Sequence, residues 1–308
     1  MTIFGDEGHR AVLKRGADVP EQPPEFPIPL GHVGIANTVA WVDLGEGRRP
    51  YRVEVGVALP RDRRGIHMSR IRAVLRELSS RSFPHLGLFV EEAARRVAGV
   101  QAGGQAQVEA RGQEPLATRG PVSGAEGLEA REVGAWARWS RQGVERAVWL
   151  TATHITACPC TQEYCRHLPG MEGASLGGHP LHITHSQRAV TTLRLRGMDS
   201  PMAPAELAPV MAQALHLTQD LLKRPDEAEL VARAHLEPQF VEDAVRAVAA
   251  GAWRRFRGLL PPHVEVEVEA VSLESIHSHD VVCRFSATLE ELGGHLNTTV
   301  QEVSHEAL

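Results

Sequence analysis

The stretch Val264-Glu265-Val266-Glu267-Val268-Glu269 alternates strictly between an apolar and an acidic residue. Successive side chains of a β-strand point to opposite faces of the sheet, so this pattern predicts a strand with one buried face and one face in water. Such strands are typical of antiparallel sheets that are covered on a single face. We therefore expect the chain to build a sheet of this kind around the segment.

The segments on either side of this strand predict two similar successions of elements. In the second half, a strand at 189–195 precedes two helices with apolar stripes, near 204–217 and from about 238, and a last strand is expected at 273–287. In the first half we expect strands at 32–44 and 51–59, helices at 71–78 and 86–97, and strand-like segments at 105–111 and 143–157, the last two separated by a Gly- and Glu-rich stretch. Both halves follow a ββααββ-like order, which predicts an α+β fold with an internal duplication of structure.

These patterns divide the chain into four expected parts. They are a flexible N-terminal arm at 1–27, a first module at 28–157, a second module at 158–293 that carries most candidate site residues, and a polar tail at 294–308. The arm is polar and rich in proline and shows no period, which is typical of segments that pack poorly.

The composition is that of a soluble globular protein. Of the 308 residues, 43% are apolar and 23% are charged. The net charge is −5 with both signs interspersed, which argues against a nucleic-acid partner. No apolar run is long enough to span a membrane, and the N-terminus lacks the features of a secretion signal. We therefore expect a cytoplasmic protein with no membrane partner.

Three of the four cysteines lie close together, at 158, 160 and 165. Such clustering in a reducing compartment favours metal binding or catalysis over a disulfide framework. Cys158 and Cys160 stand at the end of an apolar strand, where Cys158 is a reasonable thiolate ligand. Buried structural thiols are an equally good interpretation of these two residues alone. A zinc knuckle is disfavoured because no second cysteine pair has a suitable spacing.

Histidines recur after this block. His182 and His185 frame a polar turn that leads into a strand, although a lone histidine is more often a satisfied polar residue than a ligand. His277 and His279 are two residues apart in the expected last strand, so their side chains would project from the same face and could converge on one ligand. Surface histidines on a solvated face are the alternative.

Charged residues at expected helix starts form the third group of candidates. Glu227 and Glu242 could simply complement a helix dipole, but Glu242 begins an apolar stripe and could point into a pocket. Ser69 and Arg70 offer a hydroxyl, a guanidinium and backbone N–H groups at a helix start, a combination that suits phosphate. Helix capping by Ser69 is the competing explanation.

Six blocks of sequence, in this order, resemble the prokaryotic type IB GTP cyclohydrolase I family over roughly residues 28–290. They are Gly-Ile-His-Met-Ser-Arg (65–70), Cys-Pro-Cys (158–160), His-Ser-Gln-Arg (185–188), Leu-Leu-Lys-Arg-Pro-Asp-Glu (221–227), Phe-Val-Glu-Asp (240–243) and Glu-Ser-Ile-His-Ser-His (274–279). The archaeal type IV GTP cyclohydrolases carry the same blocks. Both groups belong to the tunnelling-fold superfamily, whose repeated unit is ββααββ, so the resemblance implies tandem tunnelling-fold modules with antiparallel sheets, helices on one face and a barrel closed by oligomerisation.

The resemblance implies a metal site. Cys158, His185 and Glu227 match the family's ligands to one divalent metal per subunit, for which zinc, manganese and ferrous iron are all compatible with the mixed donor set. His277 and His279 match residues that handle protons and the triphosphate, and with Cys158 they make up the implied catalytic set.

The resemblance also implies how the substrate GTP is held. Glu242 matches the glutamate that anchors the guanine ring, since a carboxylate can accept two hydrogen bonds from its N–H edge. Arg70, Arg188 and Lys223 are candidate partners of the triphosphate, together with Ser69.

The chain departs from the family pattern at two places. Ser186 replaces the asparagine of the usual His-Asn-Gln-Arg block, and the connection from Cys160 to His185 is longer than in most type IB sequences. A long connection is reminiscent of the archaeal type IV enzymes.

The resemblance implies hydrolysis of GTP at C8, release of formate and rearrangement to 7,8-dihydroneopterin triphosphate, the first step of folate biosynthesis. The alternatives are a type IV-like enzyme that gives a cyclic phosphate, another hydrolase of purines or pterins, and a tunnelling-fold protein that binds a pterin without turnover. The family implies a homotetramer with sites between subunits.

Overall fold

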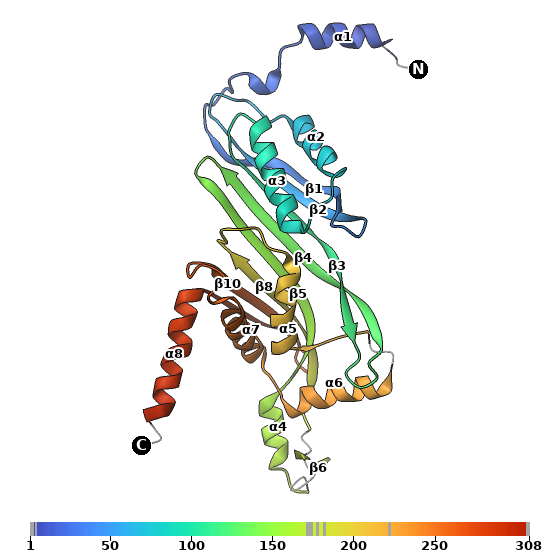
Figure 1. The fold of residues 1–308 in the computed structure, drawn as a ribbon, viewed down its shortest axis with the longest axis vertical. Helices are drawn as coiled ribbons and strands as arrows, with labels where there is room; N and C mark the ends of the chain where they lie inside the picture. The colour runs from blue at the N-terminus through green and yellow to red at the C-terminus, as the bar shows by residue number, and fades with distance from the viewer. Residues whose placement is uncertain are drawn as a thin grey trace.

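A single antiparallel sheet runs the length of the molecule (Figure 1). The computed structural model describes residues 3, 5–170, 175–176, 179–180, 183–220 and 223–305. The strands follow one another across the sheet in the order β1, β2, β3, β4, β5, β8, β10 and β11, and the short β9 (His216–Leu217) pairs with β5. Their bounds are Leu30–Asp43, Arg48–Leu59, Ala106–Arg119, Glu126–Ser140, Gly143–Ala157, Ser186–Arg196, Glu265–Leu273 and Val281–Thr288. A separate two-stranded sheet is formed by β6 (Ser175–Leu176) and β7 (His179–Pro180).

The main helices cover one face of the sheet. Helices α2 (Met68–Leu78) and α3 (Leu86–Val100) lie over the first strands, and α5 (Ala208–Ala214) and α7 (Val241–Phe256) lie over the last ones (Figure 1). Two further helices, α4 (Pro159–Arg166) and α6 (Arg224–Leu236), extend beyond the end of β5. The α+β class with helices on one face of an antiparallel sheet is therefore confirmed.

Strand β10 contains the alternating segment on which the fold prediction depended. Val266, Val268 and Ala270 are buried under α7, and the intervening Glu267 and Glu269 point to the other face. There they meet arginines of the neighbouring strands, which neutralise an otherwise acidic stripe. The alternation thus reports which face packs and which face is in water, as predicted.

The chain contains two successive ββααββ units. Strands and helices β1-β2-α2-α3-β3-β4 form the first, and β5-β8-α5-α7-β10-β11 form the second, with the same order of strands across the sheet in each. The predicted repetition is confirmed, but the sequence prediction omitted β4. This strand forms a long hairpin with β3, in which Ala106 pairs with Trp139 at one end and Arg119 pairs with Glu126 at the other. The strand at 143–157 pairs next with β8, so we propose that the units join at the turn of residues 141–142.

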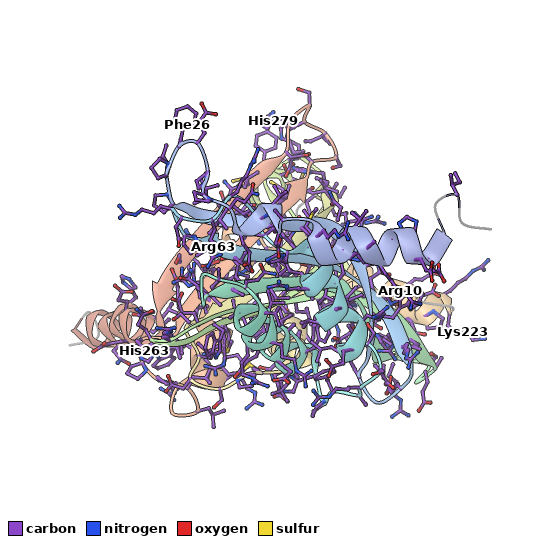
Figure 2. All side chains as sticks on the ribbon, turned by 90° about the horizontal axis from the view of Figure 1, so that it is seen from above. Arg10, Phe26, Arg63, Lys223, His263 and His279 are labelled. Atoms are coloured by element: carbon purple, nitrogen blue, oxygen red, sulfur yellow. The ribbon has the colours of Figure 1, made fainter. Side chains whose placement is uncertain are left out.

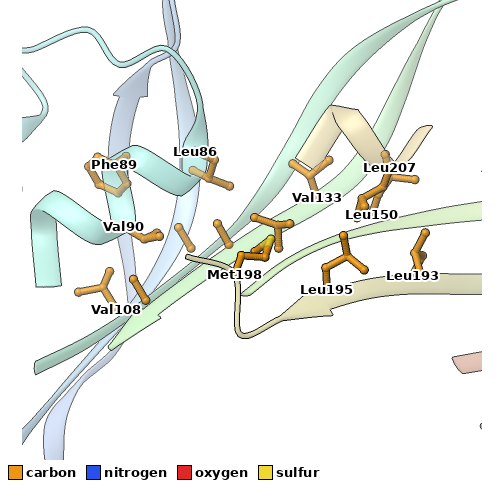
Figure 3. Close-up of a cluster of buried hydrophobic side chains, with 14 of the residues drawn as sticks. Leu86, Phe89, Val90, Val108, Val133, Leu150, Leu193, Leu195, Met198 and Leu207 are labelled. Carbon is orange, nitrogen blue, oxygen red and sulfur yellow. The ribbon is translucent and has the colours of Figure 1, made fainter. Parts of the chain in front are cut away.

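One apolar core joins the two units. Leu86, Phe89 and Val90 of α3 face the strands (Figure 3). The same cluster continues through Leu150 of β5 and Leu193 of β8, both of which are almost fully buried. The units therefore share their packing and are expected to fold together.

The two termini carry helices outside this arrangement. Helix α1 (Gly5–Arg15) and the 3-10 turn Val19–Glu21 lie in the segment predicted as an arm, and the carbonyl of Pro20 accepts hydrogen bonds from the N–H groups of Arg64 and Gly65. Helix α8 (Leu289–His305) occupies most of the segment predicted as a polar tail. Among the described residues, no helix is long and apolar enough to cross a membrane.

Four of the connections between strands lie at the same end of the sheet. Because neighbouring strands are antiparallel, β1, β3, β5 and β10 all run in the same direction. The connections that follow them are residues 44–47, 120–125, 158–185 and 274–280. The blocks that contain Cys158, His185, His277 and His279 therefore converge at this end, within the second unit.

Candidate active site

Cys158 and His185 are directly opposite one another across two strands. Ala157 and Ser186 form the last pair of the β5–β8 ladder, and the next pair continues it, with the Cys158 N–H donating to the His185 carbonyl at 3.1 Å. Side chains of directly opposite residues project from the same face with their Cβ atoms about 5 Å apart. The sheet thus brings the thiol and the imidazole together, although the sequence separates them by a long connection.

The sulfur of Cys158 lies at the start of helix α4. The backbone N–H and the hydroxyl of Thr161 both donate to Sγ, at 3.4 and 3.5 Å. These two hydrogen bonds fix the sulfur at the first turn of the helix, and cysteine is a common metal ligand.

A chain of hydrogen bonds fixes the ring of His185. The Gln187 side-chain oxygen lies 2.9 Å from His185 Nδ1, and the amide of Gln187 donates to Glu274 at 3.3 Å. The hydroxyl of Ser272 also donates to Glu274, at 2.8 Å. A proton held on Nδ1 by an acceptor leaves the Nε2 lone pair available, which is how metal-binding histidines are usually oriented. Sequence reasoning missed Gln187 and Glu274, although both belong to the quoted blocks and become opposite neighbours through the β8–β10 register.

His277 and His279 complete a group of three imidazoles. The rings of His185 and His277 have centroids 6.0 Å apart, and those of His277 and His279 are stacked at 5.4 Å. The prediction that both stand on one strand is wrong, because β10 ends at Leu273, where pairing with Arg188 ends, and β11 begins at Val281. The two histidines lie on the exposed loop between these strands, and the bend of the loop brings their rings together.

Glu242 lies in the first turn of α7 and is exposed. Burial of the Cys283 thiol on β11 raises its pKa, and the negative charge of Glu242 raises that pKa further. Glu242 is therefore close to β11, which is the strand that follows the histidine loop. The neighbouring Asp243 accepts a hydrogen bond from the Phe240 N–H at 3.2 Å, which closes the start of the helix and leaves Glu242 free to face a ligand.

Glu227 and Lys223 lie at the start of α6, and both are exposed. Glu227 does not join Cys158 and His185 in a cluster whose ligand atoms all lie within 4.8 Å of one another. Figure 2 shows Lys223 and His279 at different edges of the molecule. The donor types fit a divalent metal, since cross-strand pairing puts the thiol and the imidazole on one face, but a single chain brings together only two of the three predicted ligands.

Ser69 and Arg70 lie at the opposite end of the sheet, because α2 follows the far end of β2. Ser69 is exposed and does not cap the helix, whose N-cap is His67. Arg188 stands on β8 beside Gln187, opposite Leu273, and is exposed. Within one chain, these phosphate candidates are thus split between both ends of the sheet.

A second group of ligand-type side chains lies beside Arg70. Among the described residues, one group of at least three His, Cys, Asp or Glu side chains has all its ligand atoms within 4.8 Å of one another. Its members are Asp18, Glu21 and His67. Arg70 Nη2 lies 3.8 Å from both carboxylates, so the guanidinium already neutralises much of their charge. Sequence reasoning missed this group because two of its members belong to the arm. His182, which the sequence placed near the site, is outside the described residues.

The fold and the site together define an α+β protein of two ββααββ units with a thiol and three imidazoles gathered at one end of its sheet. The chain belongs to the family described as type I GTP cyclohydrolase folE2, whose model matches residues 17–283. GTP cyclohydrolase MptA 1 of Methanocella arvoryzae is 29% identical over 298 residues, which cover 89% of this chain and 94% of that protein. GTP cyclohydrolase MptA of Thermoplasma acidophilum is 29% identical over 286 residues, covering 89% and 96%. Among solved structures, a uricase from Bacillus fastidious aligns with a TM-score of 0.44 and 10% identity over 86% of this chain and 95% of that one.

Proposed function

We propose that this protein is a metal-dependent GTP cyclohydrolase that hydrolyses GTP at C8, releases formate and forms 7,8-dihydroneopterin triphosphate. The observation that carries the proposal is the cross-strand pair of Cys158 and His185. Gln187 orients the ring of His185, and the ring of His277 lies beside it. Membership of the GTP cyclohydrolase family supports GTP as the substrate.

In this proposal Cys158, His185 and Glu227 hold one divalent metal, which is zinc, manganese or ferrous iron. When bound, such an ion supplies water of lowered pKa for hydrolysis. Gln187 and Glu274 keep the His185 ring in the orientation that binding requires, through the hydrogen bonds described above.

Glu242 binds the guanine edge by accepting two hydrogen bonds, from the ring N–H and from the exocyclic amine. Adenine offers no such pair of donors, so this carboxylate also sets specificity. His277 and His279 transfer protons during ring opening and closure, since an imidazole gives and takes protons near neutral pH. Arg188 and Lys223, with Ser69 and Arg70, hold the triphosphate.

The separation of these residues supports an oligomer with shared sites. Ser69 and Arg70 cannot reach the histidines of their own chain, because the length of the sheet lies between them. Strands β1 and β11 stand at the sheet edges, where unpaired backbone groups favour association. We propose a homotetramer in which one subunit supplies Cys158, His185, His277 and His279 and its neighbour supplies Ser69 and Arg70. Mixing inactive Cys158→Ala and Arg70→Ala proteins should restore activity, and no recovery after proven subunit exchange would contradict shared sites.

A type IV-like reaction that yields a cyclic phosphate is the second candidate. The long connection from Cys160 to His185 favours it, and the two relatives compared above are named GTP cyclohydrolase MptA. The two reactions differ in their phosphate balance, since a cyclic phosphate requires loss of pyrophosphate and the triphosphate product retains all three phosphates.

The deciding experiment measures formate and pyrophosphate from GTP. Metal-stripped protein is reconstituted separately with zinc, manganese and ferrous iron, and Cys158→Ala protein serves as the blank for each metal. Formate without pyrophosphate supports the proposed reaction, and formate with pyrophosphate supports the second candidate. Absence of formate with every metal would overturn both and leave a protein that binds a purine or pterin without turnover.

A further inference from the structure

Asp226 is buried although its neighbours along the helix are exposed. Its side chain is 1% exposed, whereas Lys223 and Glu227 on the same first turn of α6 are in water. An ionised carboxylate is expensive to bury unless hydrogen bonds satisfy it. Asp226 therefore has a partner that its own helix does not supply.

That partner is the tip of the β3–β4 hairpin. Oδ1 of Asp226 accepts from the backbone N–H groups of Val122 and Ser123, at 2.8 and 2.9 Å, and Oδ2 accepts from the Ser123 hydroxyl at 2.6 Å. More than a hundred residues separate the two segments in sequence, and the hairpin tip lies against α6 (Figure 1). The hairpin belongs to the first unit and α6 to the second.

The contact is tight as well as polar. A Cβ placed on Gly120 would lie 2.8 Å from Asp226 Oδ2 and 2.7 Å from the Ser123 hydroxyl. The tip turns back through Gly124, which has a φ of +65°. The hairpin thus presents its N–H groups and its hydroxyl to a single position, and only a small residue at 120 leaves room for the carboxylate.

Helix α6 is held at its other end by a different contact. The side-chain amide of Gln162 on α4 donates to the carbonyl of His235, in the last turn of α6, at 2.6 Å. The first turn depends on Asp226. Loss of this contact would free the turn that carries Lys223 and Glu227 without releasing the whole helix.

We propose that Asp226 is a positioning residue, which fixes the first turn of α6 on the β3–β4 hairpin and thereby places Glu227 and Lys223. This inference rests on the proposed function, in which Glu227 is a metal ligand and Lys223 contacts the triphosphate. Residues that hold metal ligands in place typically change metal affinity about 10–100-fold when they are removed.

The test compares three disruptions of one contact. Asp226→Ala removes every acceptor, Ser123→Ala removes one donor, and Gly120→Ala pushes the hairpin away while Asp226 stays intact. Glu227→Ala is the reference for loss of a ligand. Glu291→Ala is the matched control, because Glu291 also accepts from a backbone N–H and a hydroxyl at a helix start, those of Thr288, far from the site.

Two measurements are made on the full-length, metal-stripped proteins. Zinc and manganese affinities are obtained by titration, and backbone hydrogen exchange is followed along α6. We expect Asp226→Ala and Gly120→Ala to weaken metal binding about 10–100-fold and to speed exchange in the first turn of α6, with a smaller effect for Ser123→Ala and none for Glu291→Ala. If Asp226→Ala fails to fold, Gly120→Ala still tests the contact, because it displaces the hairpin while Asp226 stays intact.

The outcomes separate the inference from the function on which it rests. If Glu227→Ala loses metal while Asp226→Ala and Gly120→Ala bind it normally, the positioning role is overturned and the metal site stands. If Glu227→Ala binds metal as tightly as the unmodified protein, the proposed metal site fails. In that case, unchanged exchange in Asp226→Ala overturns the tether as well, and faster exchange in the first turn of α6 supports it.

Discussion

The two ββααββ units share the order of their strands but differ in the connections at one end of the sheet. The first unit closes that end with residues 44–47 and 120–125, and the second closes it with residues 158–185 and 274–280. The thiol and the imidazoles all stand in or beside the longer connections. The connection 158–185 has no counterpart of similar length in the first unit, where residues 44–47 take its place, whereas 274–280 is about as long as 120–125. The repeated strands thus act as a frame, and the candidate site residues of the second unit stand in these two connections.

The units are also tied to one another near both ends of the sheet. Asp226 holds α6 to the hairpin of the first unit at the site end. At the other end, Arg146 of β5 makes a bidentate ion pair with Glu91 of α3, at 2.7 and 3.0 Å. The second unit therefore carries the proposed metal ligands and the histidine pair, and the first unit supplies contacts that support it, a division that the following predictions test.

Replacement of Cys158 should have the largest effect. Cys158→Ala removes the thiolate of the proposed metal set, and we expect turnover to fall by about a thousandfold or more, with loss of bound metal. Cys160→Ala is the matched control, because Cys160 is exposed and only two residues away. Formate release and metal content measure both proteins. Equal activity of the two variants would contradict a site built on the second unit.

A buried histidine distinguishes the cores of the two units. His154 on β5 is fully buried, and burial lowers its pKa to about 4, while Nε2 lies 2.8 Å from the Thr191 hydroxyl. Ala40 stands at the corresponding place, three residues before the end of β1. In the unfolded chain the pKa is about 6.5, so the folded state loses stability as the pH falls from about 6.5 to about 4.

Over that interval the loss from His154 amounts to about 3 kcal/mol. Denaturant unfolding at pH 7 and pH 4.5 measures it, and His154→Gln removes the titrating ring while keeping a group that can hydrogen-bond to Thr191. We expect the difference in stability between the two pH values to shrink in this variant. An unchanged pH dependence would show that His154 is protonated without cost.

The third effect concerns substrate rather than metal. Glu242→Gln removes the charge proposed to bind the guanine edge, and we expect KM for GTP to rise about a hundredfold, as for a lost charge-assisted hydrogen bond. Metal content should stay unchanged. Asp243→Asn, one residue away, is the control for damage to the start of α7. Loss of metal with unchanged affinity for GTP would reverse the assigned roles of the two carboxylates, Glu242 and Glu227.

The sequence predicted the frame better than the connections. The alternation at 264–269 predicts β10 because large apolar side chains mark its buried face. Strand β4 escaped notice because its buried face is built from Val133 followed by Ala135 and Ala137, with Gly134 beneath the ring of Trp149. Small residues give a weak apolar period, so a strand that packs closely under a helix resembles a polar linker in the sequence.

The site was predicted as a set of residues but not as an arrangement. The quoted blocks contain Cys158, His185 and the histidine pair, and strand register alone makes the first two neighbours. No local pattern tells which of two adjacent carboxylates is buried, and here Asp226 turns inward while Glu227 is exposed. That choice depends on a hairpin tip more than a hundred residues away, so it becomes visible only in three dimensions.

The smallest effect tests the support that the first unit gives. The side chains of Arg146 and Glu91 are 14% and 23% exposed, so their ion pair is partly shielded from water and joins β5 to α3. Arg146→Ala leaves Glu91 without its partner and also removes a hydrogen bond to the Met198 carbonyl. We expect unfolding to become easier by about 2 kcal/mol, measured in urea. The exposed pair of Arg284 and Glu269 is the control, since its side chains are 70% and 51% exposed and Arg284→Ala should cost under about 1 kcal/mol. If both variants lose equally little, this ion pair adds no stability to the shared apolar core and the β4–β5 ladder that already join the units.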